Sequence, residues 1–204
     1  MRVLLLNGSP KPEGCTYTAL AEVAGALEAN GVETEIVHAV RDAVLGCIGC
    51  GGCRATGRCV FDRDGVNETI EKMRHADGLI IGSPVYYASP NGAFLAFLDR
   101  LFYAGSAEFA YKPGAAIVSA RRAGTTASLD VLNKYFLIAN MPLVPSQYWN
   151  MVHGNTPEEV RRDEEGLQTM RTLGRNMAWL LRCVQAGGDR PEAEALRVRT
   201  NFIR

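Results

Sequence analysis

The chain has 204 residues, of which 47% are hydrophobic and 22% charged, as in an ordinary soluble globular domain. Lysine plus arginine and aspartate plus glutamate number 22 each, so no net charge attracts nucleic acid or an anionic lipid surface. The apolar start is too brief for a signal peptide, and no apolar run is long enough to span a bilayer. We therefore expect one domain over residues 1–204, located in the cytoplasm, with neither nucleic acid nor a membrane as partner.

Short apolar runs alternate with helical patterns along the chain. The runs are bounded and short enough to be buried strands, at 2–6, 33–38, 78–81, 115–119 and 142–144. Apolar residues at helical spacing predict helices at 20–27, 66–73, 90–103 and 129–136, and a last long helix that opens after Thr156. In the third of these helices, Ser89 is the expected N-cap and Pro90 the expected first residue.

Strands that alternate with helices in this way predict a parallel sheet covered by helices on both faces. The pattern favours an α/β three-layer sandwich with a five-stranded sheet in the flavodoxin-like order 2-1-3-4-5 over a six-stranded dinucleotide fold. Gly187, Gly188 and Pro191 break the last helix. From about residue 187 we expect a loosely packed tail or a subunit-contact arm.

A cysteine-rich insertion at about 46–60 interrupts the alternation of strands and helices. Cys47, Cys50, Cys53 and Cys59 have the spacing C-x2-C-x2-C-x5-C, and the glycines among them let the backbone coil around one point. Four thiolates in so compact a run are typical of iron–sulfur clusters, whereas structural zinc sites use two C-x2-C pairs set well apart. A loop with nothing bound is the third alternative. Cys183, in the last helix, is expected to be a buried structural thiol.

In flavodoxin-like sheets, ligands bind beyond the carboxyl ends of the strands, in the loops that follow them. The first loop, residues 7–18, has neither a Rossmann nor a P-loop fingerprint, but it opens a helix and carries a cation, Lys11. Its hydroxyl groups belong to Ser9, Thr16, Tyr17 and Thr18. Hydroxyls beside a helix N-terminus are the parts of a phosphate cradle, and a capped helix with a flexible loop is the plainer alternative.

The loops after the third and fourth predicted strands complete the expected site. The loop at 82–92 places Tyr86 and Tyr87 beside stiffening prolines, which suits the edge of a planar heteroaromatic ring, although paired tyrosines also serve simple packing. The loop at 119–126 supplies polar groups from Ser119, Arg121 and Gly124. An arginine or an N–H group there would stabilise negative charge on a reduced flavin, and a solvated arginine is the alternative.

Together the loops NGSPKPEGCTYT, GSPVYYASPNG and SARRAGTT resemble those of the flavodoxin-like NAD(P)H-dependent FMN reductase superfamily, over residue 1 to about residue 184. With the cysteine run, the chain is similar to the iron–sulfur flavoprotein branch, whose compact C-x2-C-x2-C-x4–7-C motif it satisfies. The resemblance implies FMN, with its phosphate in the first loop and its ring against the second. Its phosphate candidates are Ser9, Lys11, Thr16, Tyr17 and Thr18, and its ring candidates are Pro84, Val85, Tyr86 and Tyr87. Cys15 departs from the family pattern, which often has a small polar residue at this position, and would offer its backbone N–H to the phosphate.

The function that the resemblance implies is an FMN-dependent oxidoreductase that passes electrons between FMN and a 4Fe–4S cluster held by the four cysteines. Its partners would be a small-molecule electron donor or acceptor, NAD(P)H among them, or ferredoxin. One alternative is an NAD(P)H-dependent FMN or quinone-type reductase without a redox cluster, and another is a zinc-stapled, non-enzymatic flavodoxin-like protein. A homodimer or homotetramer is also implied, and the expected helix at 90–103 is apolar on more than one face, a surplus that needs a cover.

Overall fold

A parallel sheet forms the centre of the structure, a computed structural model that describes residues 1–192, 198, 200 and 202. The parallel strands lie in the order β2-β1-β3-β5-β6. Their bounds are β1 (Arg2–Asn7), β2 (Glu33–His38), β3 (Gly78–Tyr86), β5 (Gly114–Ala120) and β6 (Met151–His153). A short sixth strand, β4 (Ser89–Pro90), pairs antiparallel with the end of β3. The flavodoxin-like order of the parallel strands and the α/β class are thus confirmed, with the β4 hairpin added.

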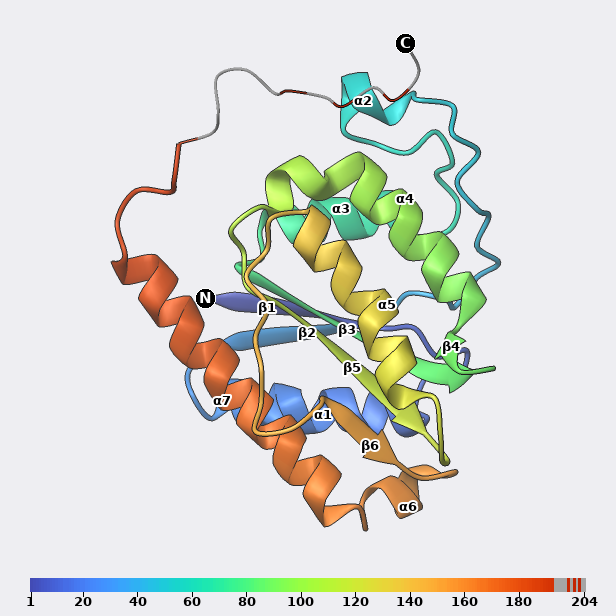
Figure 1. Cartoon of the computed structure of the whole chain (residues 1–204), viewed down its shortest axis with the longest axis vertical. Helices are drawn as coiled ribbons and strands as arrows, with labels where there is room; N and C mark the ends of the chain where they lie inside the picture. The colour runs from blue at the N-terminus through green and yellow to red at the C-terminus, as the bar shows by residue number, and fades with distance from the viewer. Residues whose placement is uncertain (193–197, 199, 201, 203–204) are drawn as a thin grey trace.

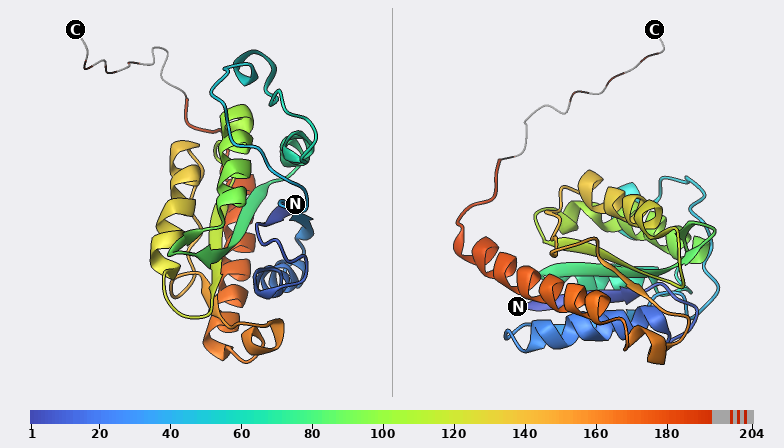
Figure 2. Two further views of the ribbon diagram at one scale, coloured as in Figure 1. Left: turned by 90° about the vertical axis from the view of Figure 1, so that its right-hand side faces the viewer. Right: turned by 60° about the horizontal axis from the view of Figure 1, so that its bottom comes forward.

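Helices cover both faces of the sheet, so the fold has three layers (Figures 1 and 2). The layer on one face consists of α1 (Cys15–Glu28) and α7 (Glu164–Ala186). The other layer consists of α3 (Val66–Arg74), α4 (Gly92–Phe109) and α5 (Thr125–Ile138). Two single-turn helices, α2 (Cys53–Thr56) and α6 (Pro157–Val160), lie in connecting segments. No helix in the described part of the chain is both long and apolar enough to cross a bilayer.

The central strands are apolar on both faces because each face meets its own helical layer. In β1, Leu4 and Leu6 pack into the core beneath α3, α4 and α5, whereas Val3 and Leu5 pack into the core beneath α1 and α7. Successive side chains of a strand point to opposite faces, so a continuous apolar run supplies two cores at once. For this reason the sequences of these strands are short unbroken apolar runs, the pattern that predicts a buried strand.

Helix α4 is apolar on more than one side because it is covered on more than one side within the chain. Its residues Phe94, Phe97, Leu98, Leu101 and Phe102 are all buried. The ring of Phe102 contacts rings of α5 and of the end of α4, at centroid distances of 5.3 to 6.0 Å. Most of the apolar surplus expected to lie in a subunit contact is therefore filled by intramolecular packing, whereas Tyr103 of the same helix is 73% exposed. The buried residues give no support to an oligomer.

The expectation of a strand at 142–144 is wrong. Leu143 makes only an isolated bridge with Gly114, and the chain returns to the edge of β5 at Met151–His153. Pro142 and Pro145 carry no N–H group, so they cannot extend a ladder of hydrogen bonds along β5. The last strand forms only where the chain has passed both prolines.

Two further expectations are also corrected by the structure. Ser89 and Pro90 do not start α4 but pair with β3; the N-cap is Asn91, whose side chain accepts a bond from the N–H of Ala93 at 3.1 Å. Cys183 is exposed rather than buried, because it lies off the buried stripe of α7. Helix α7 ends at Ala186. Much of the expected tail lies outside the described residues.

We predict that Phe136→Ala lowers the free energy of unfolding by about 3–5 kcal/mol, because the ring is fully buried against Phe102 and the start of β5. The matched control is the next residue: Leu137 is 64% exposed, so Leu137→Ala should change the free energy by less than about 0.5 kcal/mol. Urea unfolding of both variants measures the difference. Equal losses would contradict the assignment of this helix face to the core.

Candidate functional site

The loops after β1 and β3 are joined at the carboxyl edge of the sheet by Asn91. Its side-chain Nδ2 donates to the carbonyl of Gly8 at 2.9 Å, and its backbone N–H donates to the hydroxyl of Ser83 at 3.0 Å. The side chain of Asn91 also caps α4, so one buried residue fixes the first loop, the second loop and the start of a helix. A Cβ atom on Gly8 would lie 2.2 Å from the ring of Phe94, so this approach needs glycine.

The first loop turns tightly into the N-terminus of α1. Ser9 is buried; its N–H donates to Asn7 Oδ1 at 3.0 Å, and its hydroxyl accepts from the N–H of Lys11 at 3.1 Å. The N-cap of α1 is Gly14, which has no side chain to accept the first N–H groups of the helix. Uncapped N–H groups and the helix dipole favour an anion at this point, and the exposed Lys11 adds positive charge.

The remaining candidates of the first loop divide between two places. Thr16 is buried, and its hydroxyl lies 2.8 Å from that of Ser119 at the end of β5, which ties the first loop to the third. Tyr17 and Thr18 instead line a groove between α1 and α6. Burial raises the pKa of the Cys15 thiol, whose sulfur lies 3.7 Å from the carbonyl of Gly154, so Cys15 stays protonated.

The loop after β3 is a hairpin whose apex holds two residues in the left-handed region. Tyr87 has φ +50° and Ala88 has φ +57°, and the ring of Tyr87 is fully exposed. A bulky residue with positive φ costs on the order of 1–3 kcal/mol, and such strain gathers at functional sites. Gly124 of the third loop, at φ +92°, packs so closely that an added Cβ would lie 2.7 Å from Ala88 Cα. Pro84, Val85 and Tyr86 form the strand below this apex, and Arg121, in the third loop, is exposed.

A cavity of about 520 Å³ lies between the cysteine segment and α4, and all four cysteines of the compact run line it. Gly49 and Gly51 have φ values of +65° and +72°, which lets the chain reverse between successive cysteines. Asp99, Arg100 and Tyr103 form the wall contributed by α4. Figure 1 shows α2, which begins at the third cysteine, above α3 and α4 with the sheet below them.

The four cysteines are a donor set for a metal centre. Among the residues that the structure describes, no three metal-ligating side chains converge closely enough to hold a single metal ion. One zinc ion would need its sulfurs about 2.3 Å from a common centre, whereas a cluster accepts thiolates spread around a larger volume. Four cysteines around one cavity supply the number of thiolate ligands that either group requires.

Arg100 fixes the cysteine segment against α4. Its side chain is 1% exposed, and it forms an ion pair with Asp64, also buried. Its Nε donates to Cys59 Sγ at 3.1 Å, and its guanidinium also donates to the carbonyls of Leu45 and Phe61 at 3.2 and 2.9 Å. Burial alone would lower the pKa of Arg100, but the bonds to Asp64 and Cys59 outweigh it and raise the pKa, so the group is charged.

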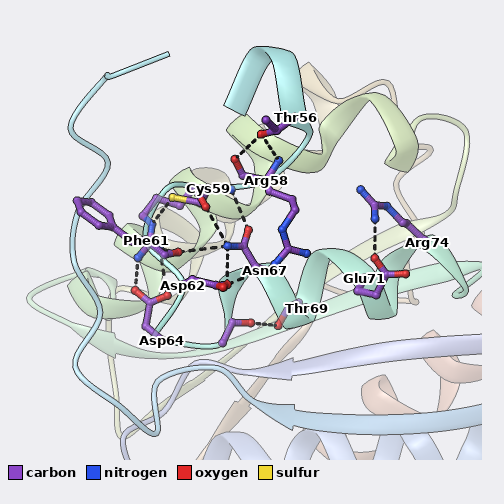
Figure 3. A network of polar contacts seen from close by, with 12 residues as sticks. Thr56, Arg58, Cys59, Phe61, Asp62, Asp64, Asn67, Thr69, Glu71 and Arg74 are labelled. Atoms are coloured by element: carbon purple, nitrogen blue, oxygen red, sulfur yellow. Dashed lines mark hydrogen bonds and ion pairs between the residues drawn. The ribbon is translucent and has the colours of Figure 1, made fainter. Parts of the chain in front are cut away.

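Asn67, at the start of α3, holds the backbone on both sides of Cys59 (Figure 3). Its Oδ1 accepts from the N–H of Cys59 at 2.8 Å, and its Nδ2 donates to the carbonyl of Cys59 at 2.9 Å and to Asp62 Oδ1 at 2.8 Å. Neither Asn67 nor Arg100 was expected from the sequence. The signal for Arg100 was its place inside the apolar stripe FLAFLDRLF, where a charge must find a partner.

Comparison with known proteins gives consistent relatives. The family described as NADPH-dependent FMN reductase matches residues 1–156. An iron-sulfur flavoprotein of Methanocaldococcus jannaschii is 31% identical over 194 residues, covering 91% of this chain and 100% of the relative. Another, of Methanosarcina thermophila, is 30% identical over 196 residues, covering 93% and 100%.

Solved structures agree on the fold. RosB, crystallised with a bound formylriboflavin phosphate intermediate, has a TM-score of 0.69 at 17% identity and covers 100% of this chain and 94% of its own. A flavodoxin from the domain Archaea has a TM-score of 0.62 at 13% identity, covering 89% of this chain and 99% of its own.

We predict that Asn67→Ala loosens the cysteine segment, because it leaves buried polar groups around Cys59 without partners, at a cost of about 1–3 kcal/mol. Trypsin should then cut faster after Arg54 and Arg58. Asn176→Ala is the control: it removes a half-buried asparagine of α7 whose Nδ2 donates to the Pro145 carbonyl at 2.7 Å, a contact outside the cysteine segment, and it should leave the digestion unchanged. Identical digestion of the two variants would show that Asn67 does not hold the segment.

Proposed function

The chain belongs to the NADPH-dependent FMN reductase family, and from this premise we propose that it passes electrons between FMN and a 4Fe–4S cluster. The ligands of the cluster would be Cys47, Cys50, Cys53 and Cys59. The observation that carries the proposal is the cavity lined by all four of these cysteines. In addition, two relatives that this chain matches over their full length are named iron-sulfur flavoproteins. When bound, FMN supplies two-electron exchange and the cluster single-electron transfer.

The FMN phosphate would lie at the N-terminus of α1. Ser9, Lys11 and Thr16 would contact it, with N–H groups of residues 15–17, so that Tyr17 would contribute through its backbone rather than through its side chain. Thr18 would not contact it, because its N–H donates to the Gly14 carbonyl at 3.0 Å and its side chain lines the outer groove. The flavin ring would lie along Pro84–Tyr87, with Ser119, Arg121 and Gly124 on the side of the third loop. The fully exposed ring of Tyr87 would then border the face at which a second substrate approaches.

Helix α4 is the physical link between the two groups. It begins at Gly92, directly after the ring loop, and its residue Arg100 contacts Cys59. Eight residues of α-helix rise about 12 Å, which sets the scale of the path from the ring loop to the cysteine cavity. The helix therefore fixes the distance between the two sites without any movement of the residues between them.

The electron donor or acceptor would be a small molecule, with NAD(P)H as a donor that stacks transiently on the flavin, or a protein such as ferredoxin. The cysteine cavity opens beside exposed apolar side chains, which suits contact with a protein partner. The proposed location is the cytoplasm, which would keep the thiols reduced. The proposed assembly is a homodimer or homotetramer, and it rests on the resemblance to the family.

We predict that Thr16→Val weakens FMN binding about 10- to 100-fold, the loss of one hydrogen bond to a charged group. Thr18→Val is the matched control, because its hydroxyl donates to the Gly14 carbonyl beside the outward groove; it should change affinity by less than about twofold. Quenching of FMN fluorescence during titration measures both. Equal affinities for the two variants would argue against the proposed phosphate site.

We predict that the anaerobically purified protein shows flavin absorption peaks on a broad iron–sulfur shoulder. Cys50→Ser should remove iron, sulfide and the shoulder while leaving flavin bound, whereas Cys183→Ser, at an exposed position of α7, should retain all of them. Flavin without iron in the unaltered protein would favour the reductase without a redox cluster. Zinc in place of iron would favour a stapled protein.

A further inference from the structure

The buried guanidinium of Arg100 contacts the cysteine segment at points on both sides of the four cysteines. Leu45 precedes the first cysteine, Cys59 is the last of them, and Asp64 lies where the segment enters α3. A planar fork with five N–H donors is the side chain that can satisfy such a set from one position. The segment is thereby closed into a loop whose two ends and last cysteine have fixed places.

The bond from Nε to Cys59 Sγ distinguishes this cysteine from the other three. Asp64 and the two carbonyls occupy Nη1 and Nη2 of Arg100, so Nε–H is the donor directed at sulfur. In the described part of the chain, Cys59 is the one cysteine of the four whose sulfur accepts a side-chain N–H bond. A thiol sulfur is a weak acceptor, whereas a sulfur bound to iron carries negative charge and accepts a stronger, charge-assisted bond.

We propose that Arg100 is a positioning residue of the cysteine site that fixes Cys59 in place for ligation and, through its Nε–H bond, raises the reduction potential of the bound cluster. This inference rests on the proposed function. A ligand held by an outer partner loses less freedom on binding metal, so its complex is more stable. Reduction adds negative charge to the cluster, and an N–H donor and a buried positive charge at one ligand sulfur favour the reduced form.

The purely structural alternative is that Arg100 serves only as the partner of Asp64. That pair alone would explain the burial of both side chains, because breaking a buried ion pair leaves an uncompensated charge. The two roles differ at one atom: Asp64→Asn breaks the ion pair but keeps the Nε–H bond, whereas Arg100→Lys keeps a positive charge and removes the donor at the Nε position. A second control, Arg54→Gln, removes an arginine that also lines the cavity.

The test reconstitutes the full chain anaerobically with ferrous iron and sulfide and measures two quantities: the rate of cluster loss to an iron chelator and the reduction potential by optical titration. We expect Arg100→Lys to lose its cluster about 10- to 100-fold faster than the unaltered protein and to have a lower potential. Asp64→Asn should not lower the potential, since the donor remains and its counter-charge is gone. Arg54→Gln should match the unaltered chelator rate.

If the unaltered protein takes up no iron and sulfide, the proposed function fails. If it loads, and Arg100→Lys matches it in both quantities, the proposed function stands and the role of Arg100 is overturned. Equal lowering of the potential in Arg100→Lys and Asp64→Asn would also overturn it, because a lost ion pair would then suffice. Should Arg100→Lys not fold, the double variant Arg100→Met/Asp64→Asn, which leaves no unpaired charge, is compared with Asp64→Asn under the same criteria.

Discussion

The position of the cysteine segment depends on one buried charge. Between β2 and α3 the chain runs as irregular backbone with a single helical turn, and an ordered segment of this kind costs conformational entropy that few apolar contacts offset. Arg100 of α4 orders this segment through its hydrogen bonds. Asp64 compensates the charge of its guanidinium, and the backbone carbonyls of Leu45 and Phe61 accept from its Nη1 and Nη2 groups. Asn67 does the same for the backbone of Cys59. The cavity keeps its walls because these two polar side chains have every strong donor engaged.

The candidate flavin edge, where the loops after β1, β3 and β5 meet, depends on the close approach of backbone segments. At Gly8 and Gly124 a side chain would collide with neighbouring groups. Because glycine has no side chain, the three loops can approach one another here. Tyr87 is strained and exposed at the same time, a combination that packing does not explain because a fully exposed ring packs against no residue in the described part of the chain. Local strain here is held by the β3–β4 pairing below it.

The order of the parallel strands could be predicted from the sequence because β1, β3 and β5 are buried on both faces and form unbroken apolar runs. The β3–β4 hairpin could not be predicted, because two-residue turns with positive φ usually carry Asn-Gly, and Tyr87-Ala88 gives no such signal. The last strand was misplaced because apolar content at 142–144 outweighed the missing N–H groups of its prolines. Spacing predicted the four cysteines as a group, and loop chemistry predicted the phosphate candidates. Asp64 was not predicted because its partner, Arg100, belongs to a distant segment, and Asn67 was not because its contacts lie in an irregular segment that has no periodic pattern.

Helix α4 makes the two candidate sites parts of one rigid body. Its first turn is capped by Asn91, which also holds the loops at the flavin edge, and its middle holds Cys59 through Arg100. A packed helix moves as a unit, so if occupancy at one end favours one arrangement of α4, the other end shares that arrangement. Thermodynamic linkage makes such coupling reciprocal: whatever free energy occupancy of the flavin edge contributes to the cysteine site, occupancy of the cysteine site returns to the flavin edge.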